Sequence, residues 1–122
     1  MLIADGNYPF STGSAPHARR VYLNLSPGMV KVTDVLAVLV DAIPIEGAQV
    51  MVPRSGPPEV PPDEPPPIFE EFHEMLPTGV VLEPLERFAF YAAAKEDSVA
   101  LVIATGEERI YANILLTIGV VI

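Results

Sequence analysis

The segment "ERFAFYAAAKEDSVALVIATG", residues 86–106, decides the predicted fold. Phe88 and Phe90 are separated by one alanine, and Leu101 and Ile103 alternate with their neighbours in the same way. A period of two is typical of a half-buried β-strand. The polar turn "KEDS" separates the two runs. The segment therefore predicts two successive strands.

Further strands are predicted on both sides of the central proline-rich segment. "RRVYLNL", residues 19–25, alternates in the same manner, and a short strand is expected over 49–52 after a turn at Glu46 and Gly47. The segment 30–43 is ambiguous, since Thr33 or Asp34 could cap a helix that Pro44 would end. Its five valines favour a buried strand. We therefore expect a strand over 30–43.

Short strands at this spacing predict an all-β fold, a single antiparallel β-sandwich or jelly-roll-like domain over 18–122. Residues 1–17 are interrupted by glycines and prolines, so they are expected to form an extended N-terminal arm. The residues expected in the sandwich core are Val21, Leu23, Val38, Val40, Phe88, Phe90, Leu101 and Ile103.

Composition excludes several classes of protein. The chain has 122 residues, the size of one domain, and its mean hydropathy of +0.37 with 50% hydrophobic residues predicts a folded protein. No apolar run approaches the ~20 residues that span a bilayer, and the first residues do not resemble a secretory signal. A net charge of -9 argues against nucleic-acid binding. The absence of cysteine excludes thiolate chemistry.

The proline-rich segment 53–67 has three possible interpretations. Pro58 and Pro61 form a PxxP ligand pattern, but the surrounding acidic residues are unlike such ligands. A hinge would need a domain on each side, and neither half is long enough to bury its own core. We therefore expect a stiff surface loop, which could contact a neighbouring subunit.

Catalytic and metal-binding motifs are not recognisable. Ser14 and His17 are near in sequence, but they lie in a glycine-containing arm without the turn that presents a nucleophile. Four residues, Glu70, Glu71, His73 and Glu74, could ligate a divalent ion, but an exposed strand face is the favoured interpretation. We therefore predict no catalytic residue, no metal site and no cofactor.

Partner contacts are expected at both ends of the chain. Tyr8 and Phe10 are large apolar residues on a segment that cannot bury them itself, so a partner is expected to cover them. The C-terminal strand has no charged side chain after Arg109 and must be paired or covered. The predicted partner-binding residues are Tyr8, Phe10, Arg19, Arg20, Pro58, Pro61, Ile118, Val120 and Ile122.

A family resemblance rests on residues 75–108, "MLPTGVVLEPLERFAFYAAAKEDSVALVIATGEE", together with "ARRVYLNL" near the start. These stretches resemble small β-sandwich structural proteins of tailed-phage virions. The chain departs from that pattern at Leu85, in the proline insertion and in the extra strand 109–122. The resemblance implies a non-enzymatic virion protein, such as a capsid decoration, cement or head-tail component.

The same resemblance implies partners and a location. Such a protein would be made in the host cytoplasm and reside in the virion, bound to the major capsid protein or neighbouring structural subunits. It would form a homo-oligomer, with a trimer favoured, and would bind neither nucleic acid nor membrane. The alternative is a carbohydrate- or receptor-binding β-sandwich module. The absence of tryptophan for sugar stacking weakens that alternative.

Overall fold

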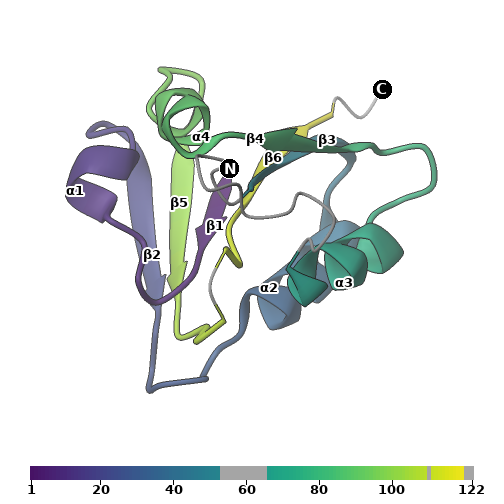
Figure 1. Cartoon of the computed structure of the whole chain (residues 1–122), viewed down its shortest axis with the longest axis horizontal. Helices are drawn as coiled ribbons and strands as arrows, with labels where there is room; N and C mark the ends of the chain where they lie inside the picture. Colours follow the sequence, from purple (N-terminus) through teal and green to yellow (C-terminus); the bar gives the residue numbers. More distant parts are fainter. Residues whose placement is uncertain (53–65, 110, 120–122) are drawn as a thin grey trace, which may run out of the picture.

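The structure is a computed structural model that describes residues 1–52, 66–109 and 111–119. In this part of the chain, helices cover a six-stranded sheet with the strand order β2-β5-β1-β6-β3-β4 (Figure 1). The elements are β1 (Leu2–Ala4), α1 (Phe10–Gly13), β2 (Arg19–Leu23), α2 (Val32–Ala42), β3 (Ile45–Met51), α3 (Pro67–Met75), β4 (Leu82–Leu85), α4 (Arg87–Ala94), β5 (Leu101–Thr105) and β6 (Ile114–Ile118).

The sheet mixes parallel and antiparallel pairs. β5 pairs in parallel with β1 and β2, and β3 pairs in parallel with β4. β6 is antiparallel to both of its neighbours, β1 and β3. The predicted all-β antiparallel sandwich is therefore wrong, because parallel strands need crossover connections, and here helices supply them.

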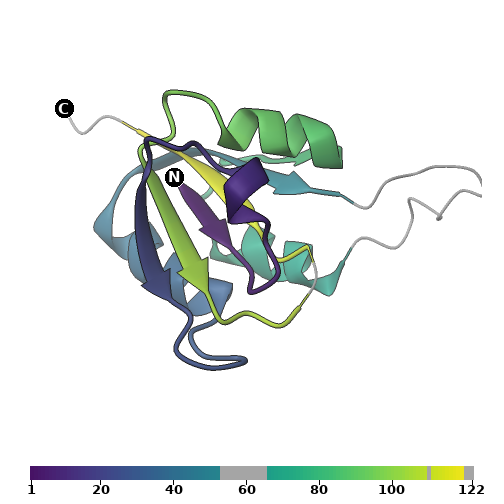
Figure 2. The same cartoon turned by 90° about the vertical axis from the view of Figure 1, so that its left-hand side faces the viewer.

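Helices cover both faces of this sheet. Figures 1 and 2 show α2 and α3 together on one side, and α1 and α4 on the other. Successive residues of a strand point to opposite faces, so Ile3 packs in the cluster with α2 and α3, while Leu2 and Ala4 pack with α4. Strands covered on both faces read as continuous apolar runs, as in "LVIAT" and "ILL".

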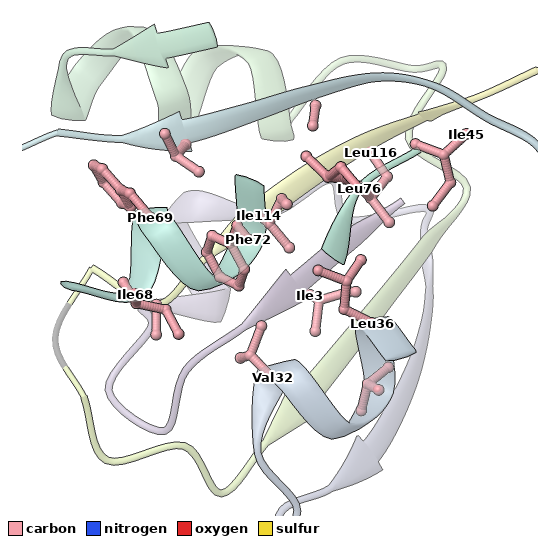
Figure 3. Close-up of a cluster of buried hydrophobic side chains, with 14 of the residues drawn as sticks. Ile3, Val32, Leu36, Ile45, Ile68, Phe69, Phe72, Leu76, Ile114 and Leu116 are labelled. Atoms are coloured by element: carbon pink, nitrogen blue, oxygen red, sulfur yellow. The ribbon is translucent and has the colours of Figure 1, made fainter. Parts of the chain in front are cut away.

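The cluster under α2 and α3 is the larger of the two apolar cores. Phe72 and Ile68 of α3 point toward Val32 of α2 and toward the sheet residues Ile3 and Ile114 (Figure 3). All five side chains are at most 1% exposed. This core fixes the helical layer on the face of the sheet opposite α4.

The predicted strand over 30–43 is a helix, α2. Its buried residues Val32, Val35 and Leu36 recur at three- and four-residue spacing, which is the period of a helix. The carboxylate of Asp34 accepts the Lys31 backbone N–H at 3.0 Å, as in a capping box. Amphipathic burial and this cap outweigh the weak strand preference of valine.

Two other segments interpreted as strands are also helices. α3 begins with Pro67, a residue suited to the first helical turn, and buries Ile68 and Phe72 four residues apart. At α4 the Glu86 side chain accepts the backbone N–H groups of Phe88 and Ala89. The alternation of aromatic residues in "RFAFYAAA" was therefore misleading, and its alanines favour helix.

The predicted sandwich core is only partly buried. Phe90 and Ile103 are buried, and Leu23, Val40 and Leu101 pack partly buried against the larger core. Three residues are exposed, with fractions of 37%, 66% and 64%, namely Val21, Val38 and Phe88. The strands predicted at 19–25 and 99–105 are confirmed as β2 and β5.

The predicted N-terminal arm is wrong. β1 lies between β5 and β6 in the middle of the sheet, and Tyr8 is buried against Phe90. β1 can be short because both of its edges and both of its faces are covered. The apolar strand β6 is likewise paired on both sides, with β1 and β3.

Some expectations fall outside the described residues. These are most of the proline-rich loop, including Pro58 and Pro61, and the terminal residues Val120 and Ile122. Within the part of the chain that the structure describes, no helix is long and apolar enough to span a membrane.

Candidate active site

Asp5 and Asn113 meet at one end of the central strands. Asp5 follows β1 and Asn113 precedes β6, and the antiparallel register of Ile3 with Ile114 places both at the same edge. The Asp5 N–H donates to Asn113 Oδ1 at 2.7 Å, and Asn113 Nδ2 donates to Asp5 Oδ2 at 3.2 Å. Both residues are 4% exposed. The Asn113 carboxamide thus orients the Asp5 carboxylate and is itself held by the Asp5 backbone N–H.

The Asp5 carboxyl is also electrostatically tuned. Burial raises its pKa, while hydrogen bonds from the Asn7 N–H at 3.0 Å, from Asn113 and from the Ala112 backbone oppose the rise. The negative charge of Glu107 adds to the rise. The net shift is upward, which makes the Asp5 carboxylate a stronger base than that of an exposed aspartate.

A hollow of about 190 Å³ opens beside this pair. It is smaller than the roughly 300 Å³ at which pockets for drug-sized ligands begin, so it suits one small molecule. Its lining combines one carboxyl, one guanidinium, two carboxamides and several phenol rings. The lining residues are Asp5, Asn7, Tyr8, Pro9, Met51, Arg87, Tyr91, Tyr111 and Asn113.

Helix α4 and the segment before β6 bring the remaining polar groups to the hollow. Arg87 is the first residue of α4 and Tyr91 follows four residues later, so both lie on the same helix face. Tyr111 has a φ of 59°, a left-handed conformation that is uncommon for a residue with a side chain. Such conformations cluster at functional sites, where the surroundings hold them.

Of the predicted partner-binding residues that the structure describes, only Tyr8 lines the hollow. Its hydroxyl donates to the Gly13 carbonyl, and burial raises the pKa of the phenol. Phe10 stacks on Tyr8 with ring centroids 5.5 Å apart. Tyr8 is therefore buried within the chain itself, and Phe10 packs partly buried against it.

The other described candidates lie elsewhere. Arg19 and Arg20 are exposed on the edge strand β2, where Arg20 donates to Ser14 Oγ at 3.2 Å. Ile118 is 39% exposed at the end of β6. Partner binding by these residues stays a prediction, and the structure does not bring them together with the hollow.

The weaker catalytic and metal candidates do not form sites. Ser14 donates to the Phe10 carbonyl, while His17 contacts the Asp97 carbonyl at 2.9 Å, so no Ser–His pair exists. The acidic cluster of α3 lies along a helix rather than a strand. Among the residues that the structure describes, no group of three or more His, Cys, Asp or Glu side chains could hold a metal ion.

The sequence contained a signal for this site that was not used. "LIADGN" and "YANILL" each place an Asp or Asn directly beside a strongly apolar run. Such polar residues at strand ends meet at one edge of a sheet, where ligands of α/β folds bind. Reading residues 1–17 as an arm removed Asp5 and Asn7 from consideration.

Comparison with known proteins agrees with this α/β architecture. The model of the RbsD / FucU transport protein family matches residues 1–121. The chain belongs to the RbsD / FucU family. A D-ribose pyranase from Variovorax paradoxus is 34% identical over 120 residues, which cover 98% of this chain and 81% of that protein.

Solved structures of the RbsD / FucU family have the same fold. Bacillus subtilis RbsD complexed with D-ribose superposes with a TM-score of 0.73 at 26% identity, covering 99% of this chain and 82% of that one. The fucose mutarotase from Streptococcus pneumoniae, solved in complex with L-fucose, gives a TM-score of 0.75 at 25% identity with the same coverage. Both structures contain a monosaccharide.

Membership of this family corrects the virion interpretation. The resemblance to phage decoration proteins was hydrophobic patterning alone, and the family match covers nearly the whole chain. The predictions of a virion structural role, of capsid partners and of a virion location are therefore wrong. The non-enzymatic prediction is overturned as well, because the relatives are a pyranase and a mutarotase, which are enzymes.

Proposed function

We propose that this protein is a mutarotase or pyranase, which interconverts the cyclic forms of a reducing monosaccharide. The observation that carries the proposal is the buried Asp5 carboxyl, held by Asn113 beside a hollow of monosaccharide size. Family membership supports the same chemistry, since its relatives include a D-ribose pyranase and a fucose mutarotase.

The reaction breaks and re-forms one C–O bond, and it needs only an acid and a base to move the protons. As the bond between the anomeric carbon and the ring oxygen breaks, the anomeric hydroxyl loses a proton and the ring oxygen gains one. The open-chain aldehyde then rotates about its C1–C2 bond, and a sugar hydroxyl closes the ring again with the reverse transfers. Atoms balance without an oxidant or a co-substrate. Positioned side chains accelerate such proton transfers by roughly 10²- to 10⁴-fold.

Asp5 is the group best suited to move these protons. Burial raises the pKa of Asp5, so the carboxyl can take the anomeric proton and give it back within one turnover. Asn113 and Asn7 hold the carboxyl and offer carboxamide groups to sugar hydroxyls.

The walls of the hollow supply binding and charge stabilisation. Arg87 brings a cationic donor that would stabilise negative charge developing on a sugar oxygen. Tyr91 and Tyr111 contribute phenols that can donate or accept hydrogen bonds, with flat rings for the apolar face of a sugar. This mixed lining suits an uncharged polyol.

Nuclear magnetic resonance exchange spectroscopy tests the proposal directly. Dissolved D-ribose or L-fucose shows separate anomeric signals, and the protein should speed magnetisation transfer between them. Asp5→Asn should lower that rate at least about 100-fold. Arg19→Gln, on the exposed edge strand, should leave it unchanged.

The contrary results are equally clear. Unaccelerated exchange of both sugars at high protein concentration would overturn the proposal. If Asp5→Asn exchanged the sugar anomers as fast as the wild-type protein, the mutarotase activity would stand but Asp5 would not be its catalytic residue.

A further inference from the structure

Two lining residues of the hollow, Tyr111 and Asn113, lie just before β6, within the described residues 111–113. Tyr111 adopts the left-handed conformation with a φ of 59°. A residue with a side chain stays in this conformation only where neighbouring contacts fix it. Hydrogen bonds to Asp5 anchor the segment at Asn113. A second anchor is needed on the other side of Tyr111.

Arg109 supplies contacts on that side. Its Nε donates to Glu107 Oε2 at 3.2 Å and its Nη2 donates to Glu107 Oε1 at 2.8 Å. Two parallel bonds of this kind fix both distance and orientation. The Glu107 side chain is only 3% exposed, so this half of the contact is shielded from water.

Glu107 is itself tied to the rest of the fold. The backbone N–H of Val32, the first residue of α2, helps to lower the pKa of the Glu107 carboxyl. Its carbonyl accepts the Gly6 N–H at 2.9 Å, in the loop that follows Asp5. The paired hydrogen bonds from Arg109 therefore end on a residue that is already hydrogen-bonded to the loop after β1 and to Thr105 of β5.

The third nitrogen of Arg109 reaches a different element. Nη1 donates to Glu71 Oε2 on α3, and the two groups form an ion pair. Arg109 thereby links the residues before β6 to α3. It does not line the hollow itself.

We propose that Arg109 is a positioning residue, whose contacts with Glu107 and Glu71 keep Tyr111 and Asn113 facing the sugar correctly. This inference rests on the proposed function. Lysine cannot reproduce the arrangement, because a point-like ammonium on a flexible stem lacks the planar fork. We call the contacts of Arg109 with Glu107 and Glu71 the clamp. The contact with Glu71 connects the clamp to α3, which neither Glu107 nor the sheet does.

The test compares Arg109→Gln, Arg109→Lys and Glu71→Gln with the matched control Arg19→Gln, another arginine-to-glutamine change on an exposed strand. Kinetic constants for sugar exchange and melting temperatures are measured on the full chain. Misplacing a reacting group by about 1 Å can cost about 100-fold in rate. We therefore expect kcat of Arg109→Gln to fall about 10- to 100-fold, with a smaller change in KM.

The remaining variants sharpen the expectation. Arg109→Lys should recover part of the lost kcat, and Glu71→Gln should lose less than Arg109→Gln. The double variant should be no worse than Arg109→Gln alone, because both changes break one clamp. If Arg109→Gln does not fold, Glu71→Gln carries the test, since it removes only one arm. A lower melting temperature with unchanged kcat and KM in the folded variants would overturn the proposal.

A second readout separates this proposal from the mutarotase activity. The Asp5 backbone N–H donates to Asn113 Oδ1, so its hydrogen exchange reports whether Asn113 stays in place. Arg109→Gln should speed exchange of this amide relative to the amides of β3, and Arg19→Gln should not. If the wild-type protein fails to interconvert sugars, the proposed function fails while this readout still decides the clamp. Unchanged hydrogen exchange of the Asp5 amide in Arg109→Gln would overturn the positioning role of Arg109.

Discussion

Two buried regions adjoin at β1 and are built in opposite ways. Ile3 belongs to the apolar cluster under α2 and α3, where burial stabilises and no directional bond is made. Asp5, two residues later, begins a polar network with Asn113, whose members are buried yet hydrogen-bonded. Burying polar groups costs free energy unless every partner is present. The apolar region therefore stabilises the fold, and the polar region fixes the positions of the Asp5 and Asn113 side chains.

The polar network extends across the strand ends. Thr105 Oγ1 donates to the Ala4 carbonyl at 2.8 Å and accepts the Glu107 N–H at 3.2 Å. Among the described residues, no buried side-chain nitrogen or oxygen lacks a hydrogen-bond partner. A fully paired network specifies positions, and this one specifies those of the carboxyl and the carboxamide beside the hollow.

The largest expected effect lies in the apolar region. Phe72→Ala should lower the free energy of unfolding by about 3–5 kcal/mol, because the ring is 0% exposed and its removal leaves a cavity. Phe88→Ala is the matched control, a phenylalanine on α4 that is 64% exposed. It should change stability by about 0.5 kcal/mol or less. Equal losses in urea denaturation would contradict the assignment of the core.

A smaller effect is expected for the charge in the polar region. Burial alone would raise the pKa of Glu107, but its hydrogen bonds to Arg109, the charge of Arg109 and the Val32 N–H lower the pKa overall. Glu107→Gln should therefore cost about 1.5–3 kcal/mol at neutral pH, as for a hydrogen bond to a charged group. The exposed neighbour Glu108 provides the control Glu108→Gln, with little expected change.

The pH dependence of this loss has a definite sign. A carboxyl whose folded pKa is lowered stabilises the protein above its unfolded pKa of about 4.3, and this stabilisation is lost as pH falls through the folded value. The difference in unfolding free energy between wild type and Glu107→Gln should shrink on acidification. A difference that stays constant from neutral to acidic pH would show that the charge of Glu107 is not what stabilises the network.

Sequence patterns predicted β2 and β5 but not the architecture. β2 alternates apolar residues with polar ones, and β5 is a continuous apolar run, so each has a pattern that is typical of a strand. The helices were missed because alternation in "RFAFYAAA" also satisfies a helical spacing, with Phe90 and Ala94 buried four residues apart. Short windows of apolar residues do not distinguish the two periods. The helix caps at Glu86 and Lys31 are the local features that favour a helix over a strand in these two segments.

The site was missed for a different reason. Asp5 and Asn113 are separated by 108 positions in sequence and meet only because β1 pairs with β6. That pairing follows from the whole sheet order, which no local pattern contains. A strand of three residues, β1, is too short to show periodicity. Asp5 was therefore assigned to an arm, although the apolar residues before it were visible.

The raised pKa of the Asp5 carboxyl should be visible in the pH dependence of the unfolding free energy. Its folded pKa is raised by burial, so ionisation destabilises the folded state, and stability falls as pH rises from about 3.9 through the folded value. Asp5→Asn lacks this titration. The unfolding free energy of Asp5→Asn minus that of wild type should therefore increase with rising pH, whatever the constant offset. Chemical denaturation at a series of pH values measures the difference, and a flat profile would contradict the raised pKa.

The smallest expected effect tests where the apolar region ends. Val35 is 8% exposed and Val38 is 66% exposed on α2, whereas a strand over 30–43 with Val38 in its core would reverse the two. Val35→Ala should cost about 1.5 kcal/mol, at roughly 0.8 kcal/mol for each buried methyl. Val38→Ala should leave stability unchanged or raise it by up to about 0.5 kcal/mol, because alanine is the better helix former. Since both changes remove the same atoms from neighbouring turns of one helix, their difference in thermal or urea unfolding isolates burial from propensity. A larger loss at Val38 than at Val35 would place the buried face on the other side of this segment and remove α2 from the apolar cluster.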